Sequence, residues 1–251
     1  MKKRLLFFLT AITLATAAIW FTACQKDNAE ATQSFSTLSA DDRTNGNSKV
    51  FPPTAHPYGK SYTEWTVDWM QEFMYFDCAH NPWLNPDNGV LFYQNGPVYF
   101  MAGLSTPGAS ANVTVPHGKA ILFPLVNFLN DYPCPDPSFE PAPGQTMEEF
   151  LTEGLEGVMS LITDLSVTID GASVSNISNY LFTTDLFYFT GNPDLSNCFD
   201  PCITGESQAA VASGYYMMLK PLSKGTHTVH YHMEIVAWGA VQDGTFNITI
   251  P

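Results

Sequence analysis

Basic residues are scarce in this chain of 251 residues. Ten Lys and Arg stand against 24 Asp and Glu, a formal net charge of −14, and three of those ten lie in the first four positions. So acidic a surface is repelled by phosphate backbones. We therefore expect no nucleic-acid partner.

The signatures of several large enzyme classes are also missing. The sequence contains no Gly-x-Ser-x-Gly nucleophile elbow and no Gly-rich phosphate-binding loop. No internal repeat and no second linker interrupt residues 50–251. A stretch of about 200 residues can bury a sizeable core, so we predict one domain there.

A long apolar run occurs only at the beginning, in "MKKRLLFFLTAITLATAAIWFTAC". A basic start, an apolar stretch and small residues before a cysteine are typical of a secretion signal. The final "FTAC" resembles the lipobox of bacterial lipoproteins, in which the cysteine after the cut is acylated. We predict a signal peptide over residues 1–23 and lipidation of Cys24; an ordinary cleaved signal peptide is the alternative.

Residues 24–49 contain few large apolar groups and many Ser, Thr, Asn and Asp. Such a segment buries too little surface to offset chain entropy and is expected to be a flexible tether. Gln25, Lys26 and Asp27 resemble the start of surface-exported lipoproteins of the Bacteroidetes group. The resemblance implies an outer-membrane lipoprotein of the cell envelope, facing either the surface or the periplasm.

Four cysteines follow the tether: Cys78, Cys134, Cys198 and Cys202. An even number in an oxidising compartment predicts two disulfides, whereas the spacing is not that of a zinc knuckle. Three connectivities are possible. The short "CFDPC" segment can close on itself, which would leave Cys78 to pair with Cys134.

Hydrophobic periodicity predicts two helices. In "SYTEWTVDWMQEFMYF", residues 61–76, a capping Ser61 or Thr63 precedes large apolar side chains spaced four apart. In residues 146–165, Thr146 and Glu149 fit a capping box ahead of a second apolar stripe.

The other apolar segments are short, rich in β-formers and separated by turn residues. Asn95-Gly96 predicts a hairpin, Pro116 to Gly118 a break between strands, and Asp170-Gly171 and Asp243-Gly244 two further turns. Without βαβ alternation, this pattern predicts a mainly β fold. We expect an antiparallel β-sandwich or jelly-roll-like domain with two helices over residues 50–251.

The order of landmarks resembles a family of secreted bacterial proteins of unknown function. The shared features are "YTEW" in the first helix, "QNGPV" at the hairpin, "VPHGK" at a strand entry and "GTHT" near the end. The resemblance covers most of residues 59–231. It implies secretion and supplies no activity, substrate or cofactor.

The stretch "GTHTVHYHMEIVAWG" carries the strongest metal-like pattern. On a strand, side chains alternate between faces, so Val229 and Tyr231 point to the core while His230, His232 and Glu234 point the other way. Two imidazoles and a carboxylate in this spacing form a candidate site for Zn or another divalent metal. Outward-facing polar residues on a half-buried strand need no ligand to explain them, and this plain interpretation is preferred to a metal site.

Two further candidates lie on the first predicted helix. Trp65 and Trp69 form a candidate aromatic platform for carbohydrate, although their spacing is also that of a core stripe. Glu64 and Asp68 form a candidate carboxylate pair, although two acids on a solvated helix face need no catalytic role.

Two hypotheses of function follow. The first is a lipid-anchored envelope protein that binds a carbohydrate polymer or a surface protein and needs no cofactor. The alternative is an extracytoplasmic hydrolase or metalloenzyme that uses His230, His232 and Glu234. Whether the protein is an enzyme stays open at this point.

Overall fold

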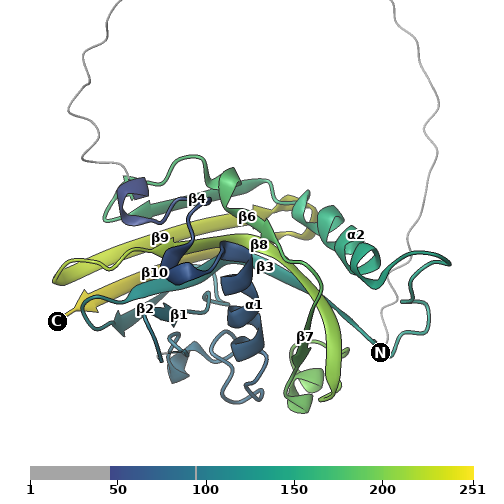
Figure 1. Ribbon diagram of the computed structural model, residues 1–251. Coiled ribbons are helices and arrows are strands. Elements are labelled where there is room, and N and C mark those ends of the chain that lie inside the picture. The colour runs from purple at the N-terminus through teal and green to yellow at the C-terminus, as the bar shows by residue number, and fades with distance from the viewer. Residues whose placement is uncertain (1–45, 94) are drawn as a thin grey trace, which may run out of the picture. The chain divides into compact units, whose positions relative to one another are not determined.

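The computed structural model describes residues 46–93 and 95–251 and contains two β-sheets and two α-helices (Figure 1). The helices are α1 (Tyr62–Phe73) and α2 (Met147–Met159). The strands are β1 (Val98–Phe100), β2 (Ala109–Thr114), β3 (Ala120–Tyr132), β4 (Asp164–Ile169), β5 (Ala172–Ser173), β6 (Leu181–Thr183), β7 (Phe187–Thr190), β8 (Ser207–Leu219), β9 (Gly225–Ile235) and β10 (Ala240–Ile250).

The fold is a two-sheet sandwich, which confirms the mainly β class predicted from the sequence. One sheet has the order β1-β3-β8-β6, with β7 also pairing with β8; the other has the order β2-β10-β9-β4-β5. The sheets are mixed, because β1 runs parallel to β3 and β2 runs parallel to β10. The remaining pairs are antiparallel.

The β3–β8 sheet is the middle layer of the domain. Phe123 on one of its faces meets Phe246 of β10, and Tyr216 on the other face meets Trp69 of α1. Helix α2 packs Leu151 and Leu155 against Ala209 and Val211 of β8. In Figure 1, α1 accordingly lies below this sheet.

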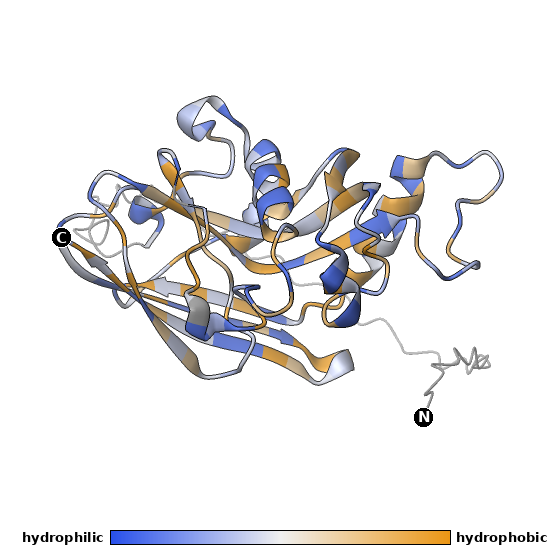
Figure 2. Ribbon diagram, turned by 90° about the horizontal axis from the view of Figure 1, so that it is seen from below, coloured by the Kyte–Doolittle hydropathy of each residue, from blue (hydrophilic) through white to orange (hydrophobic). Residues whose placement is uncertain are grey.

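Both helices begin with capping boxes, one at the predicted pair Thr146 and Glu149 and the other at Ser61, one of the two predicted capping residues. Ser61 accepts from Glu64 N–H and Thr146 accepts from Glu149 N–H, while each glutamate reaches back to the capping residue's own N–H. Reciprocal caps satisfy backbone donors that the first turn leaves unpaired. Figure 2 shows hydrophobic and hydrophilic residues alternating along the elements, as burial of one face requires.

All four predicted disulfide cysteines are bridged, as Cys78–Cys198 and Cys134–Cys202. The possibility that "CFDPC" closes on itself is therefore wrong. Cys198 and Cys202 instead tie one loop to two other segments, 120 and 68 residues away in the sequence. Two disulfides are compatible with an extracytoplasmic protein.

One turn differs from its prediction. Asp243 and Gly244 lie inside β10, and the chain reverses instead at Val236–Trp238 and at Gly239, whose φ of 61° is left-handed. Gly244 is needed for close packing, because a Cβ there would lie 2.7 Å from the ring of Tyr231. The predicted turn at Asp170-Gly171 is formed, with φ of 52° and 77°.

The signal peptide, Cys24 and most of the predicted tether lie outside the described residues. Gly46–Lys49, at the end of the predicted tether, already forms a short helical turn, and Asn47 donates to Ser175. The folded domain therefore includes residues before Val50. Across the described residues, no helix is both long enough and apolar enough to cross a membrane.

Candidate ligand-binding cavity

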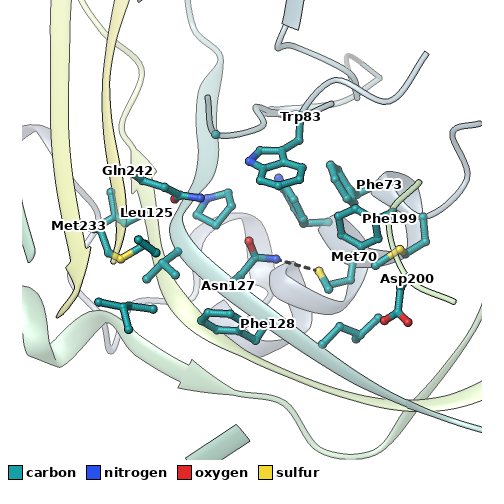
Figure 3. A pocket seen from close by; sticks show the side chains of 18 of the residues that line it. Met70, Phe73, Trp83, Leu125, Asn127, Phe128, Phe199, Asp200, Met233 and Gln242 are labelled. Atoms are coloured by element: carbon teal, nitrogen blue, oxygen red, sulfur yellow. Dashed lines mark hydrogen bonds between the residues drawn. The ribbon is translucent and has the colours of Figure 1, made fainter. Parts of the chain in front are cut away.

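A cavity of about 360 Å³ lies beside β3, within the usual range for small-molecule sites (Figure 3). Three groups of residues line it: α1 and the loops near it, β3 itself, and the adjoining ends of β9 and β10. The cavity thus lies where the middle sheet, α1 and the second sheet meet.

The cavity follows the edge of β3 rather than one of its faces. Every residue from Pro124 to Leu129 lines it. Side chains alternate along a strand, so a cavity over one face would be lined by every second residue. Strand β1 pairs only with residues 120–122, and residues beyond them have β8 as their sole strand partner among the described elements.

A β-bulge in β3, at the start of the cavity, changes the direction in which the following residues of the strand point. The register with β8 shifts between Pro124 and Val126, so Leu125 is the extra residue. Pro124 has no N–H to give to a ladder, and proline in a sheet is confined to such edges and bulges. After the bulge, Asn127 lies opposite Gly214 and beside Met70 of α1.

Aromatic rings form the wall on the α1 side. Phe73 stacks on Trp69 at 4.8 Å, Phe199 lies edge-on to Phe73 at 5.6 Å, and Trp83 lies edge-on to Phe199 at 6.0 Å. Phe199 belongs to the loop that both disulfides hold, so covalent bonds fix this wall. Figure 3 shows Trp83, Phe73 and Phe199 together on this side.

The opposite wall comes from the second sheet. Met233 and Ile235 are buried side chains of β9, and Trp238 follows them in the β9–β10 turn. Trp238 is 53% exposed and sits edge-on to Phe128 at 6.0 Å. Trp238 therefore lines the cavity and also contacts solvent.

Few polar side chains line the cavity: Asn127, Asp200 and Gln242. The amide nitrogen of Asn127 donates to the thioether sulfur of Met70 at 3.3 Å and also faces the buried hydroxyl of Tyr216. A thioether is a weak acceptor. The side-chain oxygen of Asn127 accepts no hydrogen bond within the described chain, so it can accept one from a bound molecule.

Behind the cavity, Asp131 is a buried acid, 3% exposed, at the end of β3. Burial, and next the nearby charge of Asp200, raise the pKa of Asp131 to about 7. Gln208 Nε2 donates to Asp131 at 2.6 Å, to the Pro133 carbonyl and to the Cys202 carbonyl. Asp200 thus connects the cavity to a titratable group inside the fold.

This cluster is not a metal site. Within the described ranges, the one group of three potential ligands with mutually close atoms is Asp131, Asp200 and Cys202. Cys202 is bonded to Cys134 and offers no thiolate.

The candidate metal ligands His230, His232 and Glu234 lie on the outer face of β9, away from the cavity. His230 Nε2 and His232 Nδ1 approach the two carboxylate oxygens of Asp243 at 3.3 and 3.2 Å. A carboxylate only accepts, so each of these nitrogens carries a proton and has no lone pair for a metal. The geometry supports cross-strand pairing between β9 and β10, with Glu234 further along the same row.

His227 forms a different cluster that superficially resembles a hydrolytic triad. Its Nδ1 is 2.7 Å from Asp170, and its Nε2 is 3.4 Å from the hydroxyl of Ser223 but 3.0 Å from the Ser223 carbonyl. A nitrogen that donates to the nearer carbonyl cannot take a hydroxyl proton. His227 therefore acts as a clamp between the β4–β5 turn and the entry to β9.

Asp170 is the acceptor of that clamp. Burial alone would raise the pKa of Asp170, but hydrogen bonds from His227 and Lys49 outweigh burial and hold it at about 2. Its other oxygen accepts from Thr228 N–H at 2.8 Å. These contacts fix the predicted Asp170-Gly171 turn on β9.

The four candidate residues on α1 stabilise the fold. Trp65 and Trp69 are 6% and 2% exposed, and their indole N–H groups donate to the carbonyls of Pro57 and Met101. Neither offers an exposed stacking face, although Trp69 lines the cavity. Glu64 completes the helix cap and Asp68 pairs with Lys60, so the two carboxylates do not form a pair.

Sequence reasoning missed most of the cavity, since Trp83, Asn127, Phe199, Asp200, Trp238 and Gln242 come from separate segments. Two signals were present. Pro124 interrupts an apolar run, and cysteines enclose the segment of Phe199 and Asp200. Both mark a place where regular pairing stops or where a loop is held.

The site therefore defines a class of protein: a disulfide-linked β-sandwich with an aromatic cavity at a strand edge. Comparison with protein-family models and with curated proteins finds no match. Among solved structures, the solution structure of amebosin aligns with 58% of this chain and 100% of its own length, at 12% identity and a TM-score of 0.18. That likeness carries no argument, and the suggested family stays a prediction.

Proposed function

We propose that this chain is a lipid-anchored binding protein of the bacterial cell envelope, whose ligand occupies the cavity beside β3. The observation that carries the proposal is the aromatic, partly open cavity with the side-chain oxygen of Asn127 among its few polar groups. Largely apolar cavities with a few placed polar groups are the usual form of a ligand site.

The enzymatic alternative has less support. His230 and His232 are paired with Asp243 on the outer face, and His227 is held between Asp170 and the Ser223 backbone. None of these groups lines the cavity. The cavity lining provides apolar surface and a few hydrogen-bonding groups, which are sufficient for binding a ligand without a catalysed reaction.

The cavity is tested with N-phenyl-1-naphthylamine, an apolar dye that fluoresces when it leaves water. Trp69, Trp83 and Trp238 line the site and can transfer excitation energy to a dye bound there. We expect one bound dye per chain and tryptophan-excited emission. Ala240→Phe, which adds a ring to the lining, is expected to weaken binding at least tenfold, or about 1.4 kcal/mol.

Val241→Phe is the matched control, because Val241 is the next residue of β10 and points to the outer face, where it is 37% exposed. It should bind the dye as the wild type does, within about twofold. Equal binding by the wild type and Ala240→Phe would contradict the placement of the site.

The lipid anchor is tested at Cys24. Cys24→Ala should move the protein from the membrane fraction to the soluble fraction and abolish labelling by a clickable palmitate analogue. Each CH₂ of an acyl chain that is buried in the membrane contributes about 0.8 kcal/mol to membrane binding. Loss of the acyl chain should therefore release the protein from the membrane. Wild-type protein without acyl label would contradict the proposed lipidation.

A further inference from the structure

The free edge of β3 carries backbone groups that the strand ladder leaves unused. Leu122 accepts from Met101 N–H and so points its peptide groups toward the β1 side. Peptide groups alternate along a strand, and the extra residue at the bulge shifts that alternation by one. Asn127 and Leu129 therefore point their N–H and C=O groups away from β8.

An independent contact supports this assignment. A Cβ built on Gly214 of β8 would lie 2.5 Å from the carbonyl oxygen of Val126. That carbonyl is thus directed at β8, so its neighbour Asn127 faces the other way. Beyond the ladder with β8, no backbone hydrogen bond to residues 124–131 is formed within the described chain.

An unpaired strand edge normally invites another strand, and proteins usually shorten, charge or cover it. Here the edge lies open along a cavity whose two walls are apolar. A ligand that fills this space has backbone donors and acceptors on one side and rings on both faces. That combination matches an extended polypeptide better than a ligand without regularly spaced amides.

We propose that the cavity takes an extended polypeptide segment, which adds to β3 as an edge strand beside Asn127 and Leu129. This rests on the proposed binding function and names its ligand class. Successive side chains of such a segment point alternately to the Trp83–Phe199 wall and to the Met233–Trp238 wall, so both sets are apolar where they are covered.

Charge determines what flanks the apolar part. Asp200 lines one end of the cavity, and the chain as a whole has 24 acids against ten basic residues. Complementary charge steers association and sets register. The segment is therefore expected to carry Lys or Arg at the end that lies next to Asp200.

The experiment measures displacement of N-phenyl-1-naphthylamine by a positional-scanning library of acetylated hexapeptide amides. We expect active pools with apolar residues in the centre and Lys or Arg at one end. For the best single peptide, N-methylation of the amides that face β3 should weaken binding at least tenfold, because each lost hydrogen bond accounts for a factor of up to about ten. N-methylation of the alternate amides, which face away, is the control and should change binding less than threefold.

Asp200→Asn tests the charge preference separately. This variant should reduce the preference for a peptide with a basic end about fivefold.

Each outcome decides between the ideas. If the dye binds at the cavity but no pool displaces it, the occupant is a small apolar molecule and the polypeptide proposal is overturned, while the binding function stands. Equal loss from both N-methylated peptides would also overturn strand addition. If neither dye nor peptide binds, the proposed function itself fails.

Discussion

Asp131→Asn is expected to raise the free energy of unfolding at pH 8 by about 2–4 kcal/mol. The pKa of Asp131 is about 7 in the fold because burial, and then the charge of Asp200, disfavour its ionised form. A shift of about three units above the ordinary value of 3.8 corresponds to about 4 kcal/mol. Asparagine keeps an oxygen for Gln208 Nε2 and removes the buried charge.

The pH dependence has a defined sign. Between pH 4 and pH 7 the folded state binds the Asp131 proton more tightly than the unfolded state, so wild-type stability falls as pH rises through this window. At pH 4, close to the ordinary pKa of 3.8, the Asp131 carboxyl is protonated in the folded state and partly protonated in the unfolded state, so the variant should differ from the wild type by less than about 1 kcal/mol.

Urea denaturation at pH 4, 6 and 8 measures the difference. Asp185→Asn is the control, since Asp185 is an exposed acid and its loss should leave the slope of stability against pH nearly unchanged. A wild type and an Asp131→Asn variant with parallel stability curves would contradict the buried-acid assignment.

The second large effect concerns the disulfides. Replacing Cys134 and Cys202 with serine should lower the free energy of unfolding by about 3–5 kcal/mol, because the bridge closes a loop of 68 residues. The same change removes one of the two bridges that hold the loop carrying Phe199 and Asp200 at the cavity. We therefore expect weaker dye binding as well as lower stability, measured on the folded fraction in low urea.

A second pair of serines tests the connectivity. In a variant with serine at Cys198 and Cys202, Cys78 and Cys134 should each lose their partner and both should react with iodoacetamide without reductant. Had "CFDPC" closed on itself, Cys78 and Cys134 would stay bridged and unreactive in that variant. Protection of both thiols would contradict the pairing Cys78–Cys198 and Cys134–Cys202.

The features that were predictable from the sequence are local. The caps at Ser61 and Thr146 and the turn at Asp170-Gly171 depend on residues a few positions apart. The burial of Val229, Tyr231, Met233 and Ile235 follows from alternation alone. These patterns sufficed for the fold class, because a sandwich needs little more than apolar strand faces and turns.

What could not be predicted depends on distant segments. The parallel pairs β1–β3 and β2–β10 and the disulfide pairing are fixed by tertiary packing. Asp243-Gly244 has the composition of a turn. The ring of Tyr231, however, packs so closely on Gly244 that only glycine fits at this position of β10. Helix α2 ends at Met159, before the end of its predicted range, because Asp164 starts a strand that pairs with β9.

The candidate site shows the same division. The histidine row had the recognisable pattern, but the fold places it on an outer face opposite to the cavity lining of β9. The cavity is built from aromatic residues that look like ordinary core residues in the sequence, and only the interrupted pairing of β3 leaves space between them.

Amide hydrogen exchange at β3 tests the central claim most directly, namely that a free strand edge lines the binding cavity. Measured by NMR on the wild-type protein, the amides of Asn127 and Leu129 should exchange rapidly, while that of Phe128, directed at β8, should be protected. Addition of the best peptide should protect Asn127 and Leu129 at least tenfold and leave Phe128 unchanged. Protection of Asn127 and Leu129 in the free protein, or no change in them at saturating peptide, would contradict the account.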